Sequence, residues 1–356
     1  MPILQPKQIF ETYEVHYLIK ENRYCETYRV EDEDKKSYFL KLYVKDRMPP
    51  RLVGHDGTIP SNSLCKDLYA DAILSVMFRS FVSIEGVGDC EYIVTEYYAG
   101  ELLEDILNRD VVLSFSRALK IYRDIIHGLN YLHSHYPPLV HNDITPRNIL
   151  ITNDGHVKII DLGHLSYVKN SSGRPPFDTD DLDVRYQAAE VSVYTFNEKT
   201  DIFSATAVLY HMLFGTPPWN PMAPNDGEWQ KRMAAVMLQR VRGGVLDLSE
   251  VKMPEALREI IRKGLSFNVR ERYNSTKIVL ADLGNIDPSE PSEELDSDQE
   301  GAEHEENNRP KGFEAIAGMN DLKKMLTSLP LQPGSACLLL IRLWQRRWLT
   351  PPSTAS

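Results

Sequence analysis

The stretch Leu139–Gly163 constrains the fold of this chain more than any other. It contains two short runs of apolar and β-branched residues, ILIT at 149–152 and HVKII at 156–160, joined by the turn Asn153-Asp154-Gly155. Runs of this composition are typical of β-strands, and Asp-Gly is a strong signal for a tight hairpin turn. The sequence therefore predicts a β-hairpin here.

Three polar side chains lie around this hairpin. Asn148 enters the first strand and Asp161 leaves the second, so pairing of the strands should bring these two side chains close together. Asp143 lies shortly before Asn148. Carboxylate and amide oxygens can hold a divalent metal, and a carboxylate can accept a proton from a hydroxyl group. We therefore interpret the stretch as a site for metal and a hydroxyl nucleophile beside a nucleotide phosphate.

The chain is long enough for one domain of two lobes and additional material. It has 356 residues, of which 42% are hydrophobic, so it can bury a sizeable core. The four cysteines are scattered and form no CxxC pair, so the sequence suggests neither a zinc site nor a disulfide framework. This usage fits a protein of a reducing compartment. No signal peptide and no segment long enough to span a bilayer is recognisable. We expect a cytoplasmic protein without an integral membrane segment.

The formal net charge of −11 comes mainly from one segment. Ten acidic residues and no Lys or Arg lie between Asn285 and Asn308, so the remainder of the chain is close to neutral. The segment is rich in Ser and Pro and poor in apolar residues, so it cannot bury enough surface to offset the entropy of ordering it. We predict that residues 285–311 form a disordered acidic linker. Ser292 and Ser297 precede acidic residues, which leaves open a role as sites for acid-directed kinases.

The N-terminal part predicts a small antiparallel sheet. Residues 13–19, 25–30 and 37–44 are three expected strands of a meander, and Lys41 lies in the middle of the third. Apolar residues then recur with helical spacing, which predicts a helix over 63–78.

A long helix is expected to lead into the central stretch. Residues 91–100 first form a predicted strand, and Ser114 or Ser116 can then cap the helix. The apolar stripe of this helix predicts a buried face and consists of Ala118, Tyr122, Ile125, Leu129 and Leu132.

Two motifs in the central stretch resemble those of a eukaryotic-type protein kinase domain. The run HNDITPRN, from His141 to Asn148, resembles the catalytic loop HRDLKPxN of that family. Asp161-Leu162-Gly163 resembles its metal-binding DFG triplet, and Lys41 then falls at the position of the family's β3 lysine. The chain looks like a bacterial-like variant of this family.

Later motifs follow in the order that the family would have. Residues 186–190, YQAAE, resemble the end of the activation segment, and 200–204, TDIFS, resemble the start of the buried central helix of the large lobe. Arg272 resembles a late arginine that is expected to pair with Glu190. The resemblance covers roughly residues 13–283 and implies an α+β fold in which a small antiparallel β lobe joins a large, mainly helical lobe. We expect this kinase-like domain to occupy residues 1–284.

The resemblance also implies an activity and a role for each site residue. It implies transfer of the γ-phosphoryl group of ATP, with Mg²⁺, to a protein hydroxyl, with no nucleic-acid partner. By resemblance, Asp161 holds Mg²⁺ at the phosphates, Asn148 holds a second metal ion, and Lys41 contacts the α- and β-phosphates. Asp143 accepts or orients the proton of the attacking hydroxyl. Oligomeric state is not indicated.

The loop that would cover the phosphates departs from the family pattern. In place of GxGxxG the chain has KENRYC, which puts Lys20, Asn22 and Cys25 at the glycine positions. A side chain there costs roughly 1–2 kcal/mol if the backbone is left-handed. We expect a different lid over the phosphates, in which Lys20 or Arg23 either supplies a compensating charge or is simply solvated.

Two further departures lie inside the catalytic loop. Asn142 stands where the family has an arginine that binds a phosphate on the activation segment, so we hypothesise that activity does not require phosphorylation between Gly163 and Glu190. Thr145 replaces the lysine typical of Ser/Thr kinases, which removes the usual cue to the acceptor. We favour Ser/Thr because the alternatives of tyrosine kinases at this position are also absent.

The acidic partner of Lys41 and the activity itself have open alternatives. The helix over 63–78 offers Asp67 and Asp71 as partners, and spacing does not choose between them. A pseudokinase that binds nucleotide or acts as a scaffold is one rival function. A small-molecule phosphotransferase is another, because HxDxxxxN occurs there too, but the region 186–219 disfavours it.

The C-terminal part carries a second, shorter resemblance. Residues 312–326, GFEAIAGMNDLKKML, resemble the entry segment of AAA-type ATPases, but the GxxxxGK[ST] loop that should follow is absent. Residues 338–350, LLLIRLWQRRWLT, are basic and aromatic instead. We expect 312–356 to be an incomplete AAA-like segment, truncated or frame-shifted, with a membrane-surface or partner-binding helix and a poorly ordered tail as alternatives.

Overall fold

The computed structural model describes residues 2–169, 174–219, 229–243 and 246–287. The segment 312–356 lies outside these residues, as does all of the predicted linker after residue 287. The predictions made for those parts therefore remain predictions.

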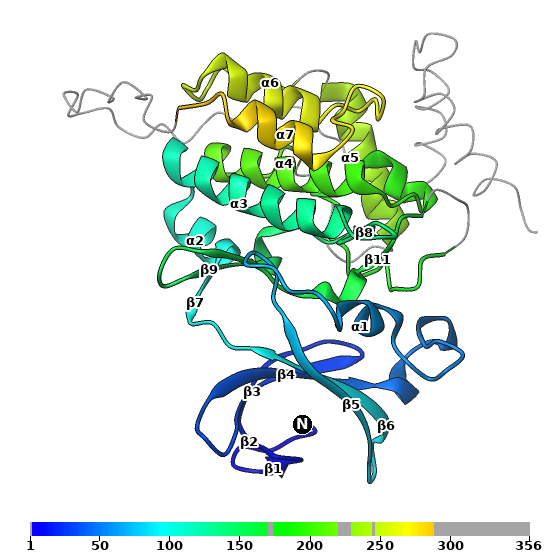
Figure 1. The fold of residues 1–356 in the computed structure, drawn as a ribbon. Helices are drawn as coiled ribbons and strands as arrows, with labels where there is room; N and C mark the ends of the chain where they lie inside the picture. Colours follow the sequence, from blue (N-terminus) through cyan, green and yellow to red (C-terminus); the bar gives the residue numbers. More distant parts are fainter. Residues whose placement is uncertain (1, 170–173, 220–228, 244–245, 288–356) are drawn as a thin grey trace, which may run out of the picture. The chain divides into compact units, whose positions relative to one another are not determined.

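The small lobe is a curled antiparallel sheet of six strands in the order β1-β2-β3-β4-β6-β5 (Figure 1). Its inner face packs a core of its own, which includes Tyr28, Leu40 and Val94. The strands predicted over 13–19, 25–30 and 37–44 are confirmed. The six strands are β1 (Ile9–Phe10), β2 (Tyr13–Glu21), β3 (Cys25–Glu31), β4 (Ser37–Val44), β5 (Val76–Ile84) and β6 (Gly88–Glu96).

The helix predicted over 63–78 is wrong. The helix here, α1, covers only Pro60–Cys65, and the chain is already in strand β5 from Val76. The run VMFRSFVSI is rich in β-branched and aromatic residues and pairs with β6 along its length, so strand pairing overrides the helical spacing. Ile73, which fits that spacing, is buried because it forms a bridge to Ile159 of the central hairpin. Two 3₁₀ turns, η1 (Lys45–Arg47) and η2 (Pro50–Leu52), lie between β4 and α1.

The large lobe is built around α3 (Phe115–His133) and α4 (Glu198–Phe214). The predicted stripe of α3 is confirmed, since every one of its members is fully buried. The helix packs against α4 and against α7 (Thr276–Leu283), as Figure 1 shows. The other helices are α2 (Leu103–Asp110), α5 (Trp229–Gly243) and α6 (Glu255–Gly264).

Helix α4 has the predicted character of a core helix. Asn197 and Thr200 form a reciprocal capping box at its N-terminus. Apolar and small side chains are buried around most of its circumference, and Gly215 ends it in a left-handed conformation with φ 74°. The buried start of α4 lies against the catalytic-loop motif.

The central hairpin is confirmed as β9 (Ile149–Thr152) and β10 (Val157–Ile159), which pair antiparallel. It sits close to α3 because Gly128 has no side chain there; a Cβ at that position would lie 2.8 Å from the Ile159 Cδ1 atom. Strand β7 (Gly100–Leu102) completes a three-stranded sheet, and β8 (Leu139–Val140) pairs with β11 (Ser166–Tyr167). Short 3₁₀ turns follow at η3 (Pro146–Asn148), η4 (Leu162–His164) and η5 (Ala189–Val193).

No helix within the described ranges is both long enough and apolar enough to cross a membrane.

Candidate active site

The loop from His141 to Asn148 is held in place by a carboxylate of helix α4. The backbone N–H groups of His141 and Asn142 donate to the Asp201 carboxylate at 2.8 and 2.9 Å. His133 Nε2 lies 3.0 Å from the same carboxylate, which is 1% exposed. A buried carboxylate with three donors is well compensated, so it fixes the loop firmly.

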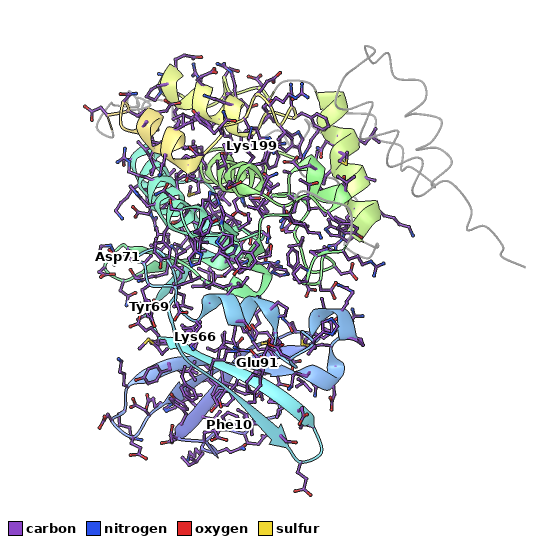
Figure 2. The ribbon with its side chains drawn as sticks, turned by 45° about the vertical axis from the view of Figure 1, so that its right-hand side comes forward. Phe10, Lys66, Tyr69, Asp71, Glu91 and Lys199 are labelled. Atoms are coloured by element: carbon purple, nitrogen blue, oxygen red, sulfur yellow. The ribbon has the colours of Figure 1, made fainter. Side chains whose placement is uncertain are left out.

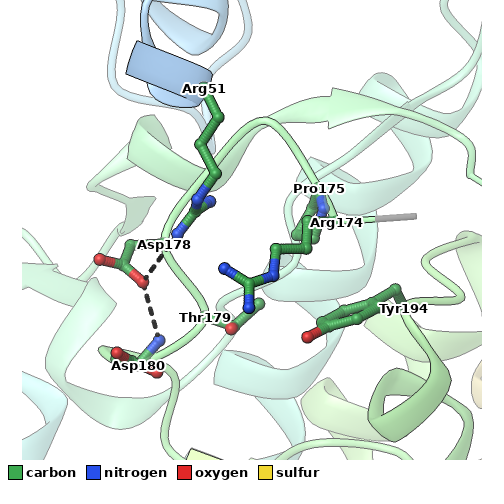
Figure 3. Close-up of a pocket in the computed structure, with 7 residues that line it drawn as sticks. All are labelled: Arg51, Arg174, Pro175, Asp178, Thr179, Asp180 and Tyr194. Carbon is green, nitrogen blue, oxygen red and sulfur yellow. Dashed lines mark hydrogen bonds and ion pairs between the residues drawn. The ribbon is translucent and has the colours of Figure 1, made fainter. Parts of the chain in front are cut away.

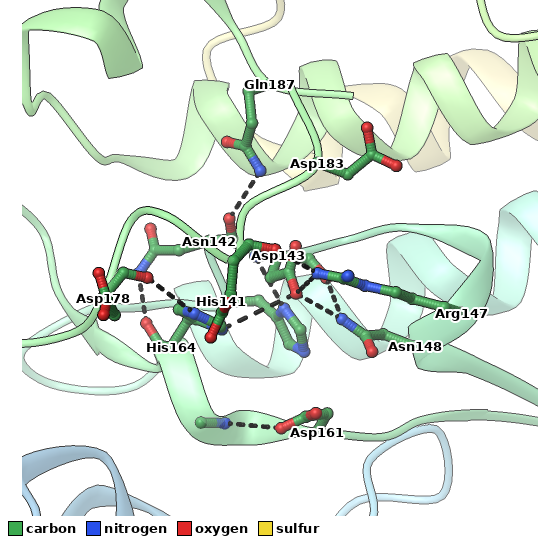
Figure 4. Close-up of polar contacts among 12 residues, drawn as sticks. His141, Asn142, Asp143, Arg147, Asn148, Asp161, His164, Asp178, Asp183 and Gln187 are labelled. Carbon is green, nitrogen blue, oxygen red and sulfur yellow. Dashed lines mark hydrogen bonds and ion pairs between the residues drawn. The ribbon is translucent and has the colours of Figure 1, made fainter. Parts of the chain in front are cut away.

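Asp143 is buried with its two carboxylate oxygens in different situations (Figure 4). Its Oδ2 atom accepts hydrogen bonds from Asn148 Nδ2 at 2.7 Å and from an Arg147 guanidinium nitrogen at 3.0 Å. Its Oδ1 atom is buried and has no hydrogen-bond partner in the part of the chain that the structure describes. One oxygen therefore anchors the group, and the other is an acceptor to which no described residue donates.

Asn148 is oriented so that its oxygen is available. Its Nδ2 atom donates to both the backbone oxygen and the carboxylate of Asp143, which assigns the amide nitrogen to that side. The Asn148 backbone oxygen accepts from Ile160 N at 2.9 Å, so the hairpin brings Asn148 next to the residue before Asp161. The predicted convergence of the two ends of the hairpin is confirmed.

Lys41 and Asp161 form a direct ion pair with 2.6 Å between Nζ and Oδ1. Burial alone would raise the pKa of Asp161, but the charge and hydrogen bond of Lys41 hold it well below its usual range, and the charge of Lys20 adds to this effect. Burial alone would lower the pKa of Lys41, but Asp161 raises it above its ordinary value. Both groups are therefore charged around neutral pH. Asp161 itself is left-handed, with φ 62°.

Neither Asp67 nor Asp71 is the partner of Lys41. Both side chains are exposed, and Asp71 lies at the edge of the molecule in Figure 2. With helix α1 ending at Cys65, the chain that carries these two acids is not helical, so the spacing argument for them does not apply. Within the described ranges, the carboxylate paired with Lys41 is that of Asp161.

A buried acid of the small lobe, Glu91 of β6, was not predicted from the sequence. It accepts hydrogen bonds from Ile59 N at 2.8 Å and Asn62 Nδ2 at 3.0 Å, and it pairs with Arg79 at 2.7 Å. These contacts attach helix α1 to the sheet. The position of Glu91 at the start of an apolar run could have indicated a buried, paired acid, since Glu is rarely buried without a partner.

The loop between β2 and β3 forms a lid of a different kind from a glycine-rich one. None of Lys20, Asn22 and Cys25 has a positive φ, so the expected backbone strain is absent at these described residues. Asn22 instead uses its side-chain oxygen to accept from Tyr24 N and Cys25 N, at 2.9 and 2.8 Å. The turn is closed by an asparagine side chain rather than by left-handed glycines.

The tip of this lid reaches the segment that follows the central hairpin. The hydroxyl group of Tyr24 donates to Asp178 Oδ2 at 2.8 Å, and Arg51 lies 3.7 Å from Asp178 Oδ1. Arg51 also helps to line a cavity of about 170 Å³ with Arg174 and Thr179 (Figure 3). These contacts join residues far apart in the sequence, so no local pattern predicts them.

Asn142, which replaces an arginine of the family pattern, acts as a brace. It is left-handed with φ 70°, and its Nδ2 atom donates to the backbone oxygens of Val140 and His164 at 3.2 and 2.7 Å. The same nitrogen lies 3.0 Å from Ser166 Oγ. The amide is therefore committed to contacts within the fold.

The predicted pair of Arg272 and Glu190 is confirmed. Two guanidinium nitrogens of Arg272 donate to the two carboxylate oxygens of Glu190, at 2.7 and 3.1 Å, and both side chains are buried. Sequence reasoning did not assign roles to Asp201, Arg147, Tyr24 or Asp178. The sequence could have suggested a role for Arg147, because this cationic residue follows Asp143 by only four positions.

Comparison with known proteins agrees with this geometry. The model of the family described as “Protein kinase domain” matches residues 74–282. Receptor-like protein kinase 5 of Arabidopsis thaliana is 31% identical over 60% of this chain and 23% of its own length. A protein of Clostridium perfringens named as a probable serine/threonine-protein kinase is 27% identical over 61% of this chain and 31% of its own length.

A third relative is the serine/threonine-protein kinase PknB of Mycolicibacterium smegmatis, 29% identical over 55% of this chain and 30% of its own length. The chain thus matches less than a third of the length of each of these curated relatives.

Proposed function

Because the chain belongs to the protein kinase family, we propose that it transfers the γ-phosphoryl group of ATP, with Mg²⁺, to a serine or threonine hydroxyl of a protein. Relatives from several organisms carry names of serine/threonine-protein kinases, which supports both the reaction class and the acceptor.

The observation that carries this proposal is the unpartnered oxygen of Asp143. An acceptor that is buried without a donor costs free energy, and a substrate hydroxyl would supply the missing donor. The other oxygen is held by Asn148 and Arg147, so the carboxylate is fixed in orientation before any substrate binds. This arrangement suits a group that orients the attacking hydroxyl and accepts its proton.

Asn148 and Asp161 fit a magnesium site at the phosphates. Mg²⁺ prefers oxygen ligands and is commonly held by one or two protein groups together with phosphates and water. Asp161 offers a carboxylate that is charged at neutral pH, and the amide of Asn148 directs its oxygen away from Asp143. Bound Mg²⁺ would neutralise charge on the phosphates. Lys41, which the ion pair places beside Asp161, would then hold the α- and β-phosphates.

Arg147 supplies a cation beside the acceptor site. Thr145 stands where Ser/Thr kinases have a lysine, and its buried hydroxyl has no partner within the described ranges. The Arg147 guanidinium instead contacts Asp143 directly at 3.0 Å. We propose that this guanidinium provides the positive charge that Thr145 cannot.

Phosphate transfer from labelled ATP to a mixture of purified proteins, with Mg²⁺ present, tests the proposal. Asp143→Asn keeps the shape of the side chain and removes the base, so transfer should fall by about 10²–10⁴-fold. Asp161→Asn should likewise lower transfer, because the charged ligand is lost. Arg270→Gln removes an exposed arginine remote from the site and should transfer at the wild-type rate. Transfer that survives both aspartate substitutions would contradict the assignment, and phosphotyrosine among the products would contradict the acceptor.

A pseudokinase is the second candidate, and two contacts favour it. Lys41 is paired with Asp161, and Tyr24 of the lid is bonded to Asp178, so groups that would meet nucleotide are engaged with the chain itself. Titration of the full chain with ATP and Mg²⁺ separates the two functions. Nucleotide binding without transfer to any protein would favour the pseudokinase. No specific observation favours the small-molecule phosphotransferase.

A further inference from the structure

A cavity of about 750 Å³ lies in the large lobe, away from the catalytic loop. Helices α4, α5 and α6 and the turn η5 all contribute to its lining. Its volume falls within the range of sites that bind small organic molecules. The residues that matter to the argument are Phe203, Trp219, Arg240, Leu248, Phe267 and Arg272.

Arg240 of α5 lines this cavity and is 5% exposed. All three of its guanidinium nitrogens are buried, and none has a hydrogen-bond partner among the residues that the structure describes. The guanidinium carbon lies 4.5 Å from the centre of the Trp219 ring and 4.8 Å from that of Phe203. The aromatic faces hold the cation in place but leave its N–H donors unsatisfied.

The charges around Arg240 do not balance. Arg272 also lies against Phe203, with its guanidinium carbon 4.7 Å from the ring centre. Glu190 is the buried carboxylate next to these two cations, and both of its oxygens are taken by Arg272. Two buried guanidinium groups thus share one carboxylate. Burial and the charge of Arg272 lower the pKa of Arg240 to about 9, in spite of Glu190.

Most other charged groups that line the cavity have partners of their own, and Lys263 lies over the Tyr273 ring at 4.1 Å from its centre. Glu271 accepts from Ser266 Oγ and Asn268 Nδ2 at 2.8 and 2.9 Å. Arg262 is paired with Glu255 and lies 3.9 Å from Glu259. Among the described residues, Arg240 is therefore the buried ionised group of this cavity that has neither a hydrogen bond nor an opposite charge in contact.

We propose that the cavity binds a small organic acid, with its carboxylate bonded to Arg240 and its apolar body against Leu246, Leu248 and Phe267. A guanidinium group matches a carboxylate through two parallel hydrogen bonds, as Arg272 and Glu190 already do nearby. An anion bound in this way satisfies the buried donors and cancels the surplus positive charge.

A monocarboxylate fits the site better than an inorganic phosphate. Among the described lining residues, Arg240 is the buried cation without a partner, and a single carboxylate is enough to satisfy its donors. Leucine and phenylalanine side chains on the wall offer no donors to additional phosphate oxygens, whereas they can bury an alkyl or aryl group.

Calorimetric titration of the full chain with octanoate tests this inference, with octanamide as the neutral analogue of the same shape. Octanoate should bind saturably and raise the melting temperature, and octanamide should bind at least about tenfold more weakly because it lacks the charge. Arg240→Gln should weaken octanoate binding by a similar factor, whereas Arg270→Gln should not change it. Arg240→Lys keeps the charge but loses the two-pronged geometry, so we expect an intermediate affinity.

Several outcomes would overturn the inference. One is that octanoate does not bind saturably, or that octanamide binds as tightly as octanoate. Another is that the folded Arg240→Gln or Arg240→Lys chain binds octanoate as tightly as the wild type. A third is that inorganic phosphate binds more tightly than octanoate. The readout is binding rather than phosphate transfer, so the result is independent of the proposed kinase activity.

Discussion

The large-lobe half and the small-lobe half of the candidate active site differ in where the contacts of their side chains lie. In the large lobe, Asp201 holds the loop from His141 to Asn148 and Asn148 holds Asp143, whose buried Oδ1 atom has no partner among the described residues. In the small lobe, Lys41 and Tyr24 make contacts that end on Asp161 and Asp178 of the other half. Under the proposed function, nucleotide binding would break contacts of the small-lobe half and would leave those of the large-lobe half in place.

The strongest test of the large-lobe half is Asp201→Asn. The substituted amide keeps one acceptor oxygen, but its NH₂ group would face at least one of the donors of His141, Asn142 and His133, so about 3–5 kcal/mol of unfolding free energy should be lost. Chemical denaturation of the full chain measures this loss. The exposed substitution Asp71→Asn is the control and should change the unfolding free energy by less than about 0.5 kcal/mol. An Asp201→Asn chain of wild-type stability would contradict the view that the loop is preorganised.

A second large-lobe contact gives a pH dependence. His211 of α4 lies 2.7 Å from the Tyr186 hydroxyl, and burial together with the charge of Arg185 lowers its pKa from 6.5 to about 4. The unfolded chain therefore binds the proton more readily between these values, and the stability from neutral His211 is lost as the pH falls through this window. Allowing for partial exposure, roughly 1–2 kcal/mol is at stake.

Unfolding free energy measured from pH 7 to pH 4 tests this dependence on His211. In the His211→Gln chain the fall with decreasing pH should be shallower than in the wild type. Parallel curves for the two chains would exclude His211 as the titrating group.

The small-lobe half should respond mildly to Tyr24→Phe. This substitution removes the hydroxyl that bonds Asp178 and keeps the ring, so opening the lid no longer breaks a hydrogen bond of about 0.5–1.5 kcal/mol. We expect nucleotide to bind up to about tenfold more tightly, as measured by calorimetry. Tyr38→Phe is a matched control, because its hydroxyl bonds Asp32 within the small lobe. Weaker nucleotide binding by Tyr24→Phe would mean that the bond belongs to the occupied state.

The smallest effect is expected from removing hydroxyl groups on the segment between Gly163 and Glu190. The Nδ2 atom of Asn142 is engaged in the fold and the amide is neutral, so this residue offers no cation to a phosphate on this segment. The chain with S166A, S171A, S172A and T179V should keep its transfer rate within about threefold, since among the described residues two neutral hydrogen bonds of Ser166 are lost. Abolished transfer would show that phosphorylation there is required.

Local patterns in the sequence predicted the large-lobe half well. The hairpin, the stripe of α3 and the core character of α4 depend on short-range periodicity and turn chemistry, which the residues themselves encode. The same reasoning failed over 63–78, because Ile73 is buried through a bridge to Ile159, far along the chain. Helical spacing cannot distinguish burial by a helix from burial by such a tertiary contact.

The small-lobe half could not be predicted in the same way. The Tyr24 bond to Asp178 joins residues separated by 154 positions, and no local rule points from one to the other. The spacing over 63–78 predicts a helical partner for Lys41, whereas the structure pairs Lys41 with Asp161, 120 positions along the chain. The two contacts that sequence reasoning missed both join the lobes, and such contacts depend on how the complete fold is assembled.

The attachment of helix α1 has a mechanical consequence. Its six residues span only about 9 Å. Glu91 holds it at Ile59 and Asn62, and Arg79 holds Glu91 in turn. Because helix α1 is this short and is bonded to the sheet at its N-terminal end, we expect it to stay fixed and not to move toward or away from Lys41. We therefore expect the position of the Lys41 side chain to be set by its ion-pair partner Asp161, which belongs to the large lobe.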